Sequence, residues 1–147
     1  MHRHTACGLR KVWLRNGHVL RETPYGPAVA VHDVAGLHRA IGLCLVDHKG
    51  RLPGSEIRCL RVEMDLSQAR LARLLGESEA CLRAWESGRQ RITRPPERLL
   101  RGLYREHGRG DGTVRQLVES IARLEREGRW KGMELEETRR GWEARAA

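Results

Sequence analysis

The spacing of apolar residues predicts five short amphipathic helices between residues 33 and 107. Side chains three, four or seven positions apart share one face of a helix, and each predicted helix carries such a set. The first helix begins after a capping Asp33 and runs to about Asp47. Ser67 can cap the third helix and Ser78 the fourth, and Pro95-Pro96 suits the first turn of the fifth. The apolar positions are Val34, Leu37, Ile41 and Cys44; Ile57, Leu60 and Met64; Leu71, Leu74 and Leu75; Leu82 and Trp85; and Leu99, Leu100, Leu103 and Tyr104.

The first 32 residues have a different pattern, which predicts strands and turns. Val12–Leu14 and Val19–Leu20 flank Arg15–His18, whose Asn-Gly pair is a strong hairpin signal. A second turn, Pro24–Pro27, precedes the apolar run Ala28–Val31. We therefore expect a small β-meander before the first helix.

The chain after residue 107 begins with the glycine-rich stretch 108–112, which we interpret as a flexible break. A phosphate-binding loop is disfavoured there, because no strand precedes it and no Gly-Lys-Ser/Thr follows. A clear amphipathic helix comes next, and the tail predicts a hairpin turning at 139–141. The stripe of this helix, which fits either a core or a partner surface, is Val114, Leu117, Val118, Ile121 and Leu124.

These elements predict a mainly α protein with small β elements, divided into three parts. Residues 1–48 form a β-meander plus helix, residues 49–107 a helical domain, and residues 108–147 a C-terminal helix and hairpin. The 147 residues are enough for one main core with a small satellite.

The charge is basic and unevenly distributed. The chain has 28 Lys and Arg against 19 Asp and Glu, a net charge of +9, and only three of the basic residues are lysines. Residues 49–110 hold 14 basic and 8 acidic side chains, whereas residues 111–147 are balanced at 8 and 8. Arginine suits phosphate groups and guanine edges, so the excess favours a nucleic-acid partner.

The four cysteines stand singly, with no Cys-x-x-Cys pair, which predicts reduced thiols in a cytoplasmic protein. No apolar run approaches the roughly 20 residues of a membrane span, so we expect a soluble protein with no membrane partner. A metal site can be imagined from scattered ligands, but zinc needs four converging ligands at tight spacing. We predict no metal and no cofactor; the ligands considered are His2, His4, Cys7, Cys44 and His48.

Catalytic motifs are missing from the sequence. There is no Gly-x-Ser-x-Gly and no His-Glu-x-x-His, and Glu56, Glu63 and Asp65 are better explained as helix-end and surface charges. We predict that the protein is not an enzyme.

The stretch from Leu66 to Gly88 joins two of the predicted helices through Gly76, and this spacing is typical of a helix-turn-helix. Ala72 is small enough to let the second helix approach. Leu75, Leu82 and Trp85 fill the angle between the helices, with Trp85 in the core, which leaves Arg70, Arg73 and Arg83 outside. An ordinary helical hairpin that does not contact DNA is the alternative.

The motif Leu66-Ser67-Gln68-x-x-Leu71-Ala72-x-Leu74-Leu75-Gly76-x-Ser78, followed by Trp85-Glu86-x-Gly88, resembles the Xre family of Cro-type, lambda-repressor-like regulators. The resemblance covers residues 52–104 and implies a lambda-repressor-like five-helix DNA-binding domain with its recognition helix at 78–87. It also implies that Gln68 braces the DNA backbone. The residues implied to face the bases are Ser78, Glu79, Ala80 and Arg83, and those implied to meet phosphates are Arg89, Gln90, Arg91 and Arg94. The sequence departs from the family pattern at Glu77, Ala80, Cys81 and Ala84.

A second, looser resemblance links Thr23–Gly26, residues 32–38 and Cys7-Gly8 to MqsA-type antitoxins, which carry a zinc module with paired Cys-x-x-Cys motifs. Only Cys7 of such a pattern is present here. The resemblance implies a toxin as a possible protein partner.

We therefore expect a sequence-specific transcriptional regulator, a repressor or autoregulator that binds double-stranded DNA at a palindromic operator as a homodimer. Dimerisation would use the stripe from Val114 to Leu124 or the β elements at either end. The alternative is an antitoxin-type module that neutralises a toxin, with DNA binding secondary.

Overall fold

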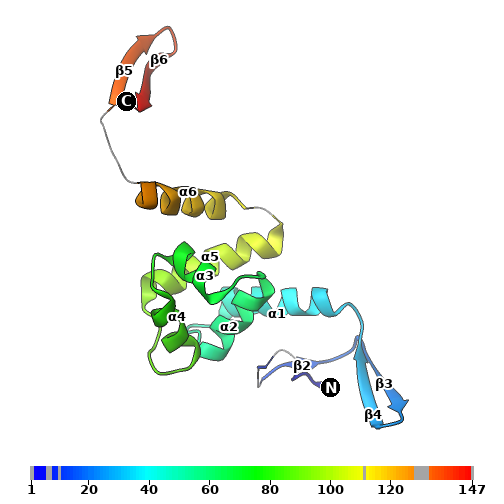
Figure 1. The fold of residues 1–147 in the computed structure, drawn as a ribbon. Helices are drawn as coiled ribbons and strands as arrows, with labels where there is room; N and C mark the ends of the chain where they lie inside the picture. The colour runs from blue at the N-terminus through cyan, green and yellow to red at the C-terminus, as the bar shows by residue number, and fades with distance from the viewer. Residues whose placement is uncertain (1, 6–7, 10, 111, 128–132, 147) are drawn as a thin grey trace.

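The computed structural model describes residues 2–5, 8–9, 11–110, 112–127 and 133–146. The described chain is mainly α-helical, with small antiparallel strand pairs, as the sequence predicts (Figure 1). The helices are α1 (Val34–His48), α2 (Gly54–Glu63), α3 (Gln68–Leu75), α4 (Glu79–Glu86), α5 (Arg94–Arg109) and α6 (Thr113–Glu127). The strands are β1 (His2–Arg3), β2 (Trp13–Leu14), β3 (His18–Thr23), β4 (Gly26–Val31), β5 (Met133–Thr138) and β6 (Gly141–Ala146).

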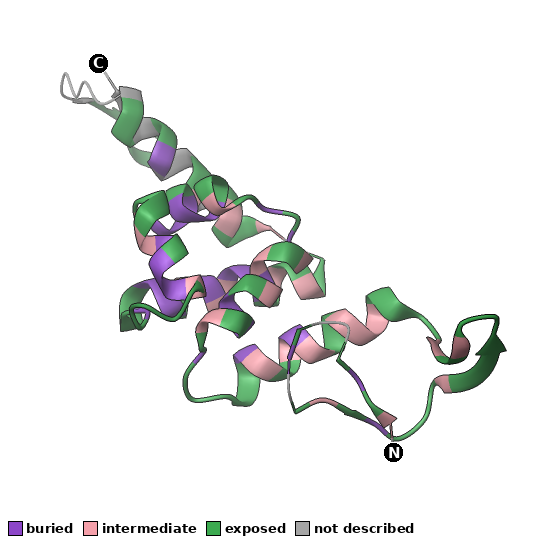
Figure 2. Ribbon diagram, turned by 60° about the horizontal axis from the view of Figure 1, so that its bottom comes forward, coloured by how far each residue is buried: buried purple, intermediate pink, exposed green. Residues whose placement is uncertain are grey.

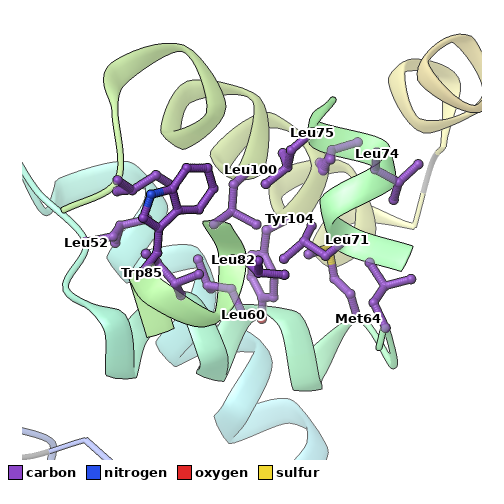
Figure 3. Packing of buried hydrophobic residues seen from close by; sticks show 14 of the residues in the cluster. Leu52, Leu60, Met64, Leu71, Leu74, Leu75, Leu82, Trp85, Leu100 and Tyr104 are labelled. Atoms are coloured by element: carbon purple, nitrogen blue, oxygen red, sulfur yellow. The ribbon is translucent and has the colours of Figure 1, made fainter. Parts of the chain in front are cut away.

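One apolar core lies among α1 to α5 (Figures 2 and 3). Leu60, Leu82 and Leu100 are fully buried there, beside the ring of Tyr104. A buried leucine contributes about 1.5–3 kcal/mol to folding through the apolar surface it removes from water. The predicted faces of α2 to α5 supply this core, so the apolar periodicity is confirmed for these four helices. The predicted face of α1 is wrong: Val34 and Cys44 are exposed, and Val46 packs in the core with Leu43 and Leu45 against it. The reason is that α5 packs on the face of α1 that carries Gly42.

The predicted caps of α1, α3 and α4 are confirmed. The side chain of Asp33 accepts a hydrogen bond from the Gly36 N–H at 3.1 Å, and the Ser67 and Ser78 hydroxyls each accept one, also at 3.1 Å, from the N–H three residues on. Each bond satisfies an N–H that the first helical turn leaves unpaired. Gly76 ends α3 with φ 70°, a conformation that glycine adopts without strain.

The predicted hairpin around Asn16-Gly17 is wrong. Strand β2 pairs with β1, while β3 pairs with β4 along six positions, from His18 opposite Val31 to Thr23 opposite Gly26. The Gly17 carbonyl continues this ladder by accepting the His32 N–H at 2.8 Å. The second turn thus forms the longer hairpin, and β3 pairs with β4 rather than with β2, which the first turn would have required.

Helix α1 packs directly on α5. A Cβ on Gly42 would lie 2.0 Å from the Tyr104 hydroxyl oxygen, so only glycine permits this approach. Arg101 of α5 also donates hydrogen bonds to the carbonyls of Leu45 and Val46, at 3.3 and 3.0 Å. The division at residue 48 stays a prediction, but α1 belongs to the same core as α2 to α5.

The glycine-rich stretch is partly helical, contrary to the predicted break from residue 108. Helix α5 includes Gly108 and ends at Arg109, followed by the capping Gly110, whose φ is 82°. A Cβ on Gly108 would lie 2.8 Å from a methyl group of Leu43, so Gly108 serves close packing against α1. The predicted C-terminal helix and hairpin are present, with β5 and β6 joined at 139–140.

Helix α6 is fixed to the end of α5 by a carboxylate. The Glu106 side chain accepts hydrogen bonds from the Val114 N–H, at 2.9 and 3.0 Å, and from the Arg115 N–H at 3.4 Å. A carboxylate at a helix N-terminus also interacts favourably with the helix dipole. Of the predicted apolar stripe, Val118 packs against the core and Val114 is partly exposed. The other stripe side chains lie outside what the structure describes.

Candidate nucleic-acid interface

Helix α4 has one buried face and one exposed face. Leu82 and Trp85 point into the core, where α4 packs on α2 and α3. The four residues predicted to face bases, Ser78, Glu79, Ala80 and Arg83, are all exposed. The structure therefore presents these side chains together on the first turns of one helix.

No N-terminal strand covers this face in the part of the chain that the structure describes. The β3–β4 hairpin extends beyond the far end of α1, away from α4 (Figure 1). Among the described helices, α4 makes its main contacts with α2 and α3 alone. The exposed side of α4 is thus open to an approaching molecule.

Glu79 and Arg83 form an ion pair, with 3.2 Å between the Arg83 Nη1 and Glu79 Oε1 atoms. Both side chains are about half exposed, and they stand one turn apart on α4. An exposed pair of this kind contributes only about 0.3–0.5 kcal/mol. Arg83 can therefore leave Glu79 for a better acceptor at little cost.

The residues predicted to meet phosphates do not form one cluster. Arg89 lies beside the start of α4, where Ser78, Ala80, Arg89 and Gln90 line a surface hollow of about 360 Å³. Arg91 is exposed in the following turn. Arg94 instead points toward the loop before α2, where its Nη1 lies 3.4 Å from the Gly50 carbonyl oxygen. Arg89 thus joins the exposed face of α4 directly, and Arg94 does not.

Gln68 contacts a buried ion pair that the sequence analysis did not identify. Arg61 of α2 donates two hydrogen bonds to the Glu86 carboxylate, at 2.8 and 2.9 Å, and a third to the Leu66 carbonyl at 3.0 Å. The Gln68 amide lies 3.4 Å from the same carboxylate. The pair ties α2, α3 and the end of α4 together. Glu86 belongs to the Trp-Glu pair of the sequence motif, but no feature of the sequence indicates that Arg61 is its partner.

A second polar cluster joins the N-terminal segment to α1 and α2. The Nε2 atoms of His4 and His38 lie 3.3 Å apart, and His38 Nδ1 lies 3.2 Å from a Glu63 oxygen. With the tautomer in which His38 Nδ1–H donates to Glu63, His38 Nε2 accepts a hydrogen bond from His4 Nε2–H. This cluster holds the buried His4 in place.

His4 does not gather with the helix ligands considered for a metal. Its hydrogen-bond partner is His38 rather than Cys44 or His48, the His2 ring lies against His18 with 5.2 Å between the ring centroids, and Cys7 lies outside the described residues. Within the described ranges, no group of three or more His, Cys, Asp or Glu side chains could hold a metal ion.

We expect the contact between His4 and His38 to weaken as the pH falls below the usual histidine range. Burial, followed by the nearby His38 and His2 rings, lowers the pKa of His4 below its usual value of 6.5. The folded state thus favours the neutral ring, so this stability is present above pH 6.5 and is lost as the pH falls through the lowered pKa. NMR titration of the histidine and Trp13 ring signals will measure it.

The matched control is His4→Leu, which removes the titrating group and fills the same buried position with an apolar side chain. The Trp13 signal of this variant should not change with pH over the same range. A Trp13 titration that persists in His4→Leu would assign the change to another group.

No family model, curated protein or solved structure matches this chain. The assignment of a function therefore depends on the residues themselves. None of the helices in the described ranges is long and apolar enough to span a membrane.

Proposed function

We propose that this protein is a sequence-specific regulator of transcription that binds double-stranded DNA. In this proposal, α3, the Gly76 turn and α4 form the helix-turn-helix of a lambda-repressor-like domain, and α4 enters the major groove. The observation that carries it is the exposure of Ser78, Glu79, Ala80 and Arg83 on a helix whose opposite face is buried. The match of the sequence to the Xre motif at family spacing supports the same function.

Base recognition is assigned to the exposed first turns of α4. An arginine can bind the O6 and N7 atoms of guanine with two hydrogen bonds, and a glutamate can accept a hydrogen bond from the cytosine amino group. Arg83 and Glu79 offer both chemistries side by side. Ser78 and Ala80 are small, so they allow a close approach of α4 to the groove.

Phosphate contacts are assigned to Gln68, Arg89, Arg91 and Arg94. One N–H of the Gln68 amide points to Glu86, which leaves its second N–H for a phosphate oxygen. Arg89 and Arg91 follow α4 directly and are exposed. Such contacts set the register of the protein on the duplex and supply most of the affinity without reading sequence.

The active form is proposed to be a homodimer on a palindromic operator. One eight-residue helix such as α4 contacts few base pairs. Two copies of the helix placed one helical turn of DNA apart, about 34 Å, give useful specificity. Size-exclusion chromatography with light scattering, with and without operator DNA, will report the number of copies.

Arg83→Ala is expected to lower affinity for the selected site by about 1–3 kcal/mol while leaving non-specific affinity unchanged, because a base contact is lost and no phosphate contact is. A binding-site selection on random duplexes will first define the site, and fluorescence anisotropy will then measure both affinities. Arg21→Ala is the matched control, since Arg21 is also exposed but lies on the β3–β4 hairpin. Equal losses on all sequences would refute base reading by Arg83.

A protein-interaction module of the antitoxin type is the second candidate. Its supporting observation is the exposure of large apolar side chains on both hairpins: Leu20 and Tyr25 on the β3–β4 hairpin, and Leu135 and Trp142 on the β5–β6 hairpin. Exposed apolar groups of this size favour contact with a protein surface. Co-purification of a small partner that protects these hairpins from hydrogen exchange, in a protein that does not bind DNA, would favour this candidate.

A further inference from the structure

Helices α3 and α6 enclose a basic cleft of about 440 Å³ on the side of α3 that faces α6. Arg70 and Arg73 of α3 line it, opposite Arg123 and Arg126 of α6. Both arginine pairs have i, i+3 spacing, so each pair lies on one face of its helix. The fold therefore gathers four exposed guanidinium groups from two helices into one space.

Among the residues that the structure describes, the positive charge of the cleft is only partly offset. In the described ranges, none of these four guanidinium groups forms an ion pair, and the one acidic residue that lines the cleft, Glu119, is paired with Arg115 at 3.2 Å. Like charges on adjacent turns repel and destabilise a helix. An anion in the cleft would remove this repulsion.

Contacts between the helices support the cleft. Leu74 of α3 and Ala122 of α6 are buried at its base, and the Glu106 carboxylate fixes the start of α6. An anion-binding site gains affinity when its cationic groups are already gathered, because less side-chain freedom is lost on binding.

We propose that this cleft binds phosphate groups of the DNA backbone beside the bases that α4 reads. The proposal rests on the DNA-binding function proposed above and adds α6 to the interface. Two observations favour DNA as the anion. Helix α3 packs against both α4 and α6, so the cleft and α4 belong to one body. The guanidinium group of arginine can donate two parallel hydrogen bonds to phosphate oxygens, and a duplex offers a phosphate about every 1.7 Å along its axis.

The test is the salt dependence of DNA affinity in Arg123→Ala/Arg126→Ala. Each phosphate contact contributes about 0.9 to the slope of log K against log salt, so losing two contacts should reduce the slope by about 1.8. The affinity should fall on specific and non-specific duplexes alike, because phosphates carry no sequence information. Alanine favours helix, so α6 should persist, and circular dichroism will check it.

The matched control is Arg15→Ala/Arg21→Ala, which removes the same charge from the N-terminal segment, at the opposite end of the molecule (Figures 1 and 2). At moderate salt, charges farther than about 10 Å from the DNA are screened, so the control slope should equal that of the wild type. If the α6 variant loses helix, Arg123→Gln/Arg126→Gln repeats the measurement.

The outcomes separate this inference from the proposed function. A reduced slope in the α6 variant alone supports the cleft as a phosphate site. If that variant binds DNA with the wild-type slope, the inference is overturned and the proposed function stands. Binding of an acidic protein segment in the cleft would not change this conclusion. A wild-type protein that binds no DNA overturns both.

Discussion

Replacing Arg61 by methionine is expected to lower the free energy of unfolding by about 3–5 kcal/mol. The substitution keeps the aliphatic stem but removes the guanidinium group, so the buried Glu86 carboxylate loses its two hydrogen bonds from Arg61 at 2.8 and 2.9 Å. The Glu86 side chain is only 5% exposed, so water cannot replace them. Urea unfolding followed by circular dichroism will measure the loss.

Glu79→Ala is the control, because it also breaks an arginine–glutamate pair that involves α4, but an exposed one. Its cost should be only about 0.3–0.5 kcal/mol. Equal costs for the two variants would contradict the special role of burial in the Arg61–Glu86 pair. The double variant Arg61→Met/Glu86→Leu should recover part of the loss, because an apolar pair of similar size leaves no buried charge.

DNA affinity is expected to fall roughly a thousandfold between about 50 and 200 mM salt if about six phosphates are contacted. The reason is that every phosphate neutralised by an arginine releases a condensed counterion, and added salt opposes that release. The four arginines of the α3–α6 cleft and the three arginines that follow α4 offer enough cationic groups for six such contacts, whereas the neutral Gln68 amide would not add to the slope. Titrations of a labelled operator duplex at four or five salt concentrations will give the slope.

A flat salt response would contradict the assignment of these arginines to phosphates. The comparison should use chloride at constant pH, since the His4 cluster responds to acid. A non-specific duplex of the same length serves as the control, and its slope should be close to that of the operator because both present the same phosphates.

Local rules made α3 and α4 predictable from the sequence. A serine cap, an apolar face and a glycine with positive φ act within a few residues of one another, and all three are present as predicted. The exposure of the four residues at the start of α4 follows from the same periodicity. These features depend on neighbours along the chain, which a sequence displays directly.

Contacts between distant segments were not predictable. Arg61 and Glu86 are 25 residues apart, and His4 and His38 are 34 apart, so no spacing rule connects them. The N-terminal hairpin failed for a related reason. Its Asn-Gly signal is favourable alone, but β3 has one better partner in β4, and a local signal does not reveal that competition. The arginine cleft likewise depends on how α6 folds back against α3.

The close crossing of α1 over Tyr104 has a practical consequence for anyone who wishes to isolate the segment proposed to bind DNA. A fragment beginning at residue 49 would contain every residue assigned to the operator, yet it would strip the cover from Tyr104 and take away the carbonyl acceptors of Arg101. Such a fragment would leave an aromatic ring and a guanidinium group without their native surroundings. Shortened versions should therefore keep the whole of α1.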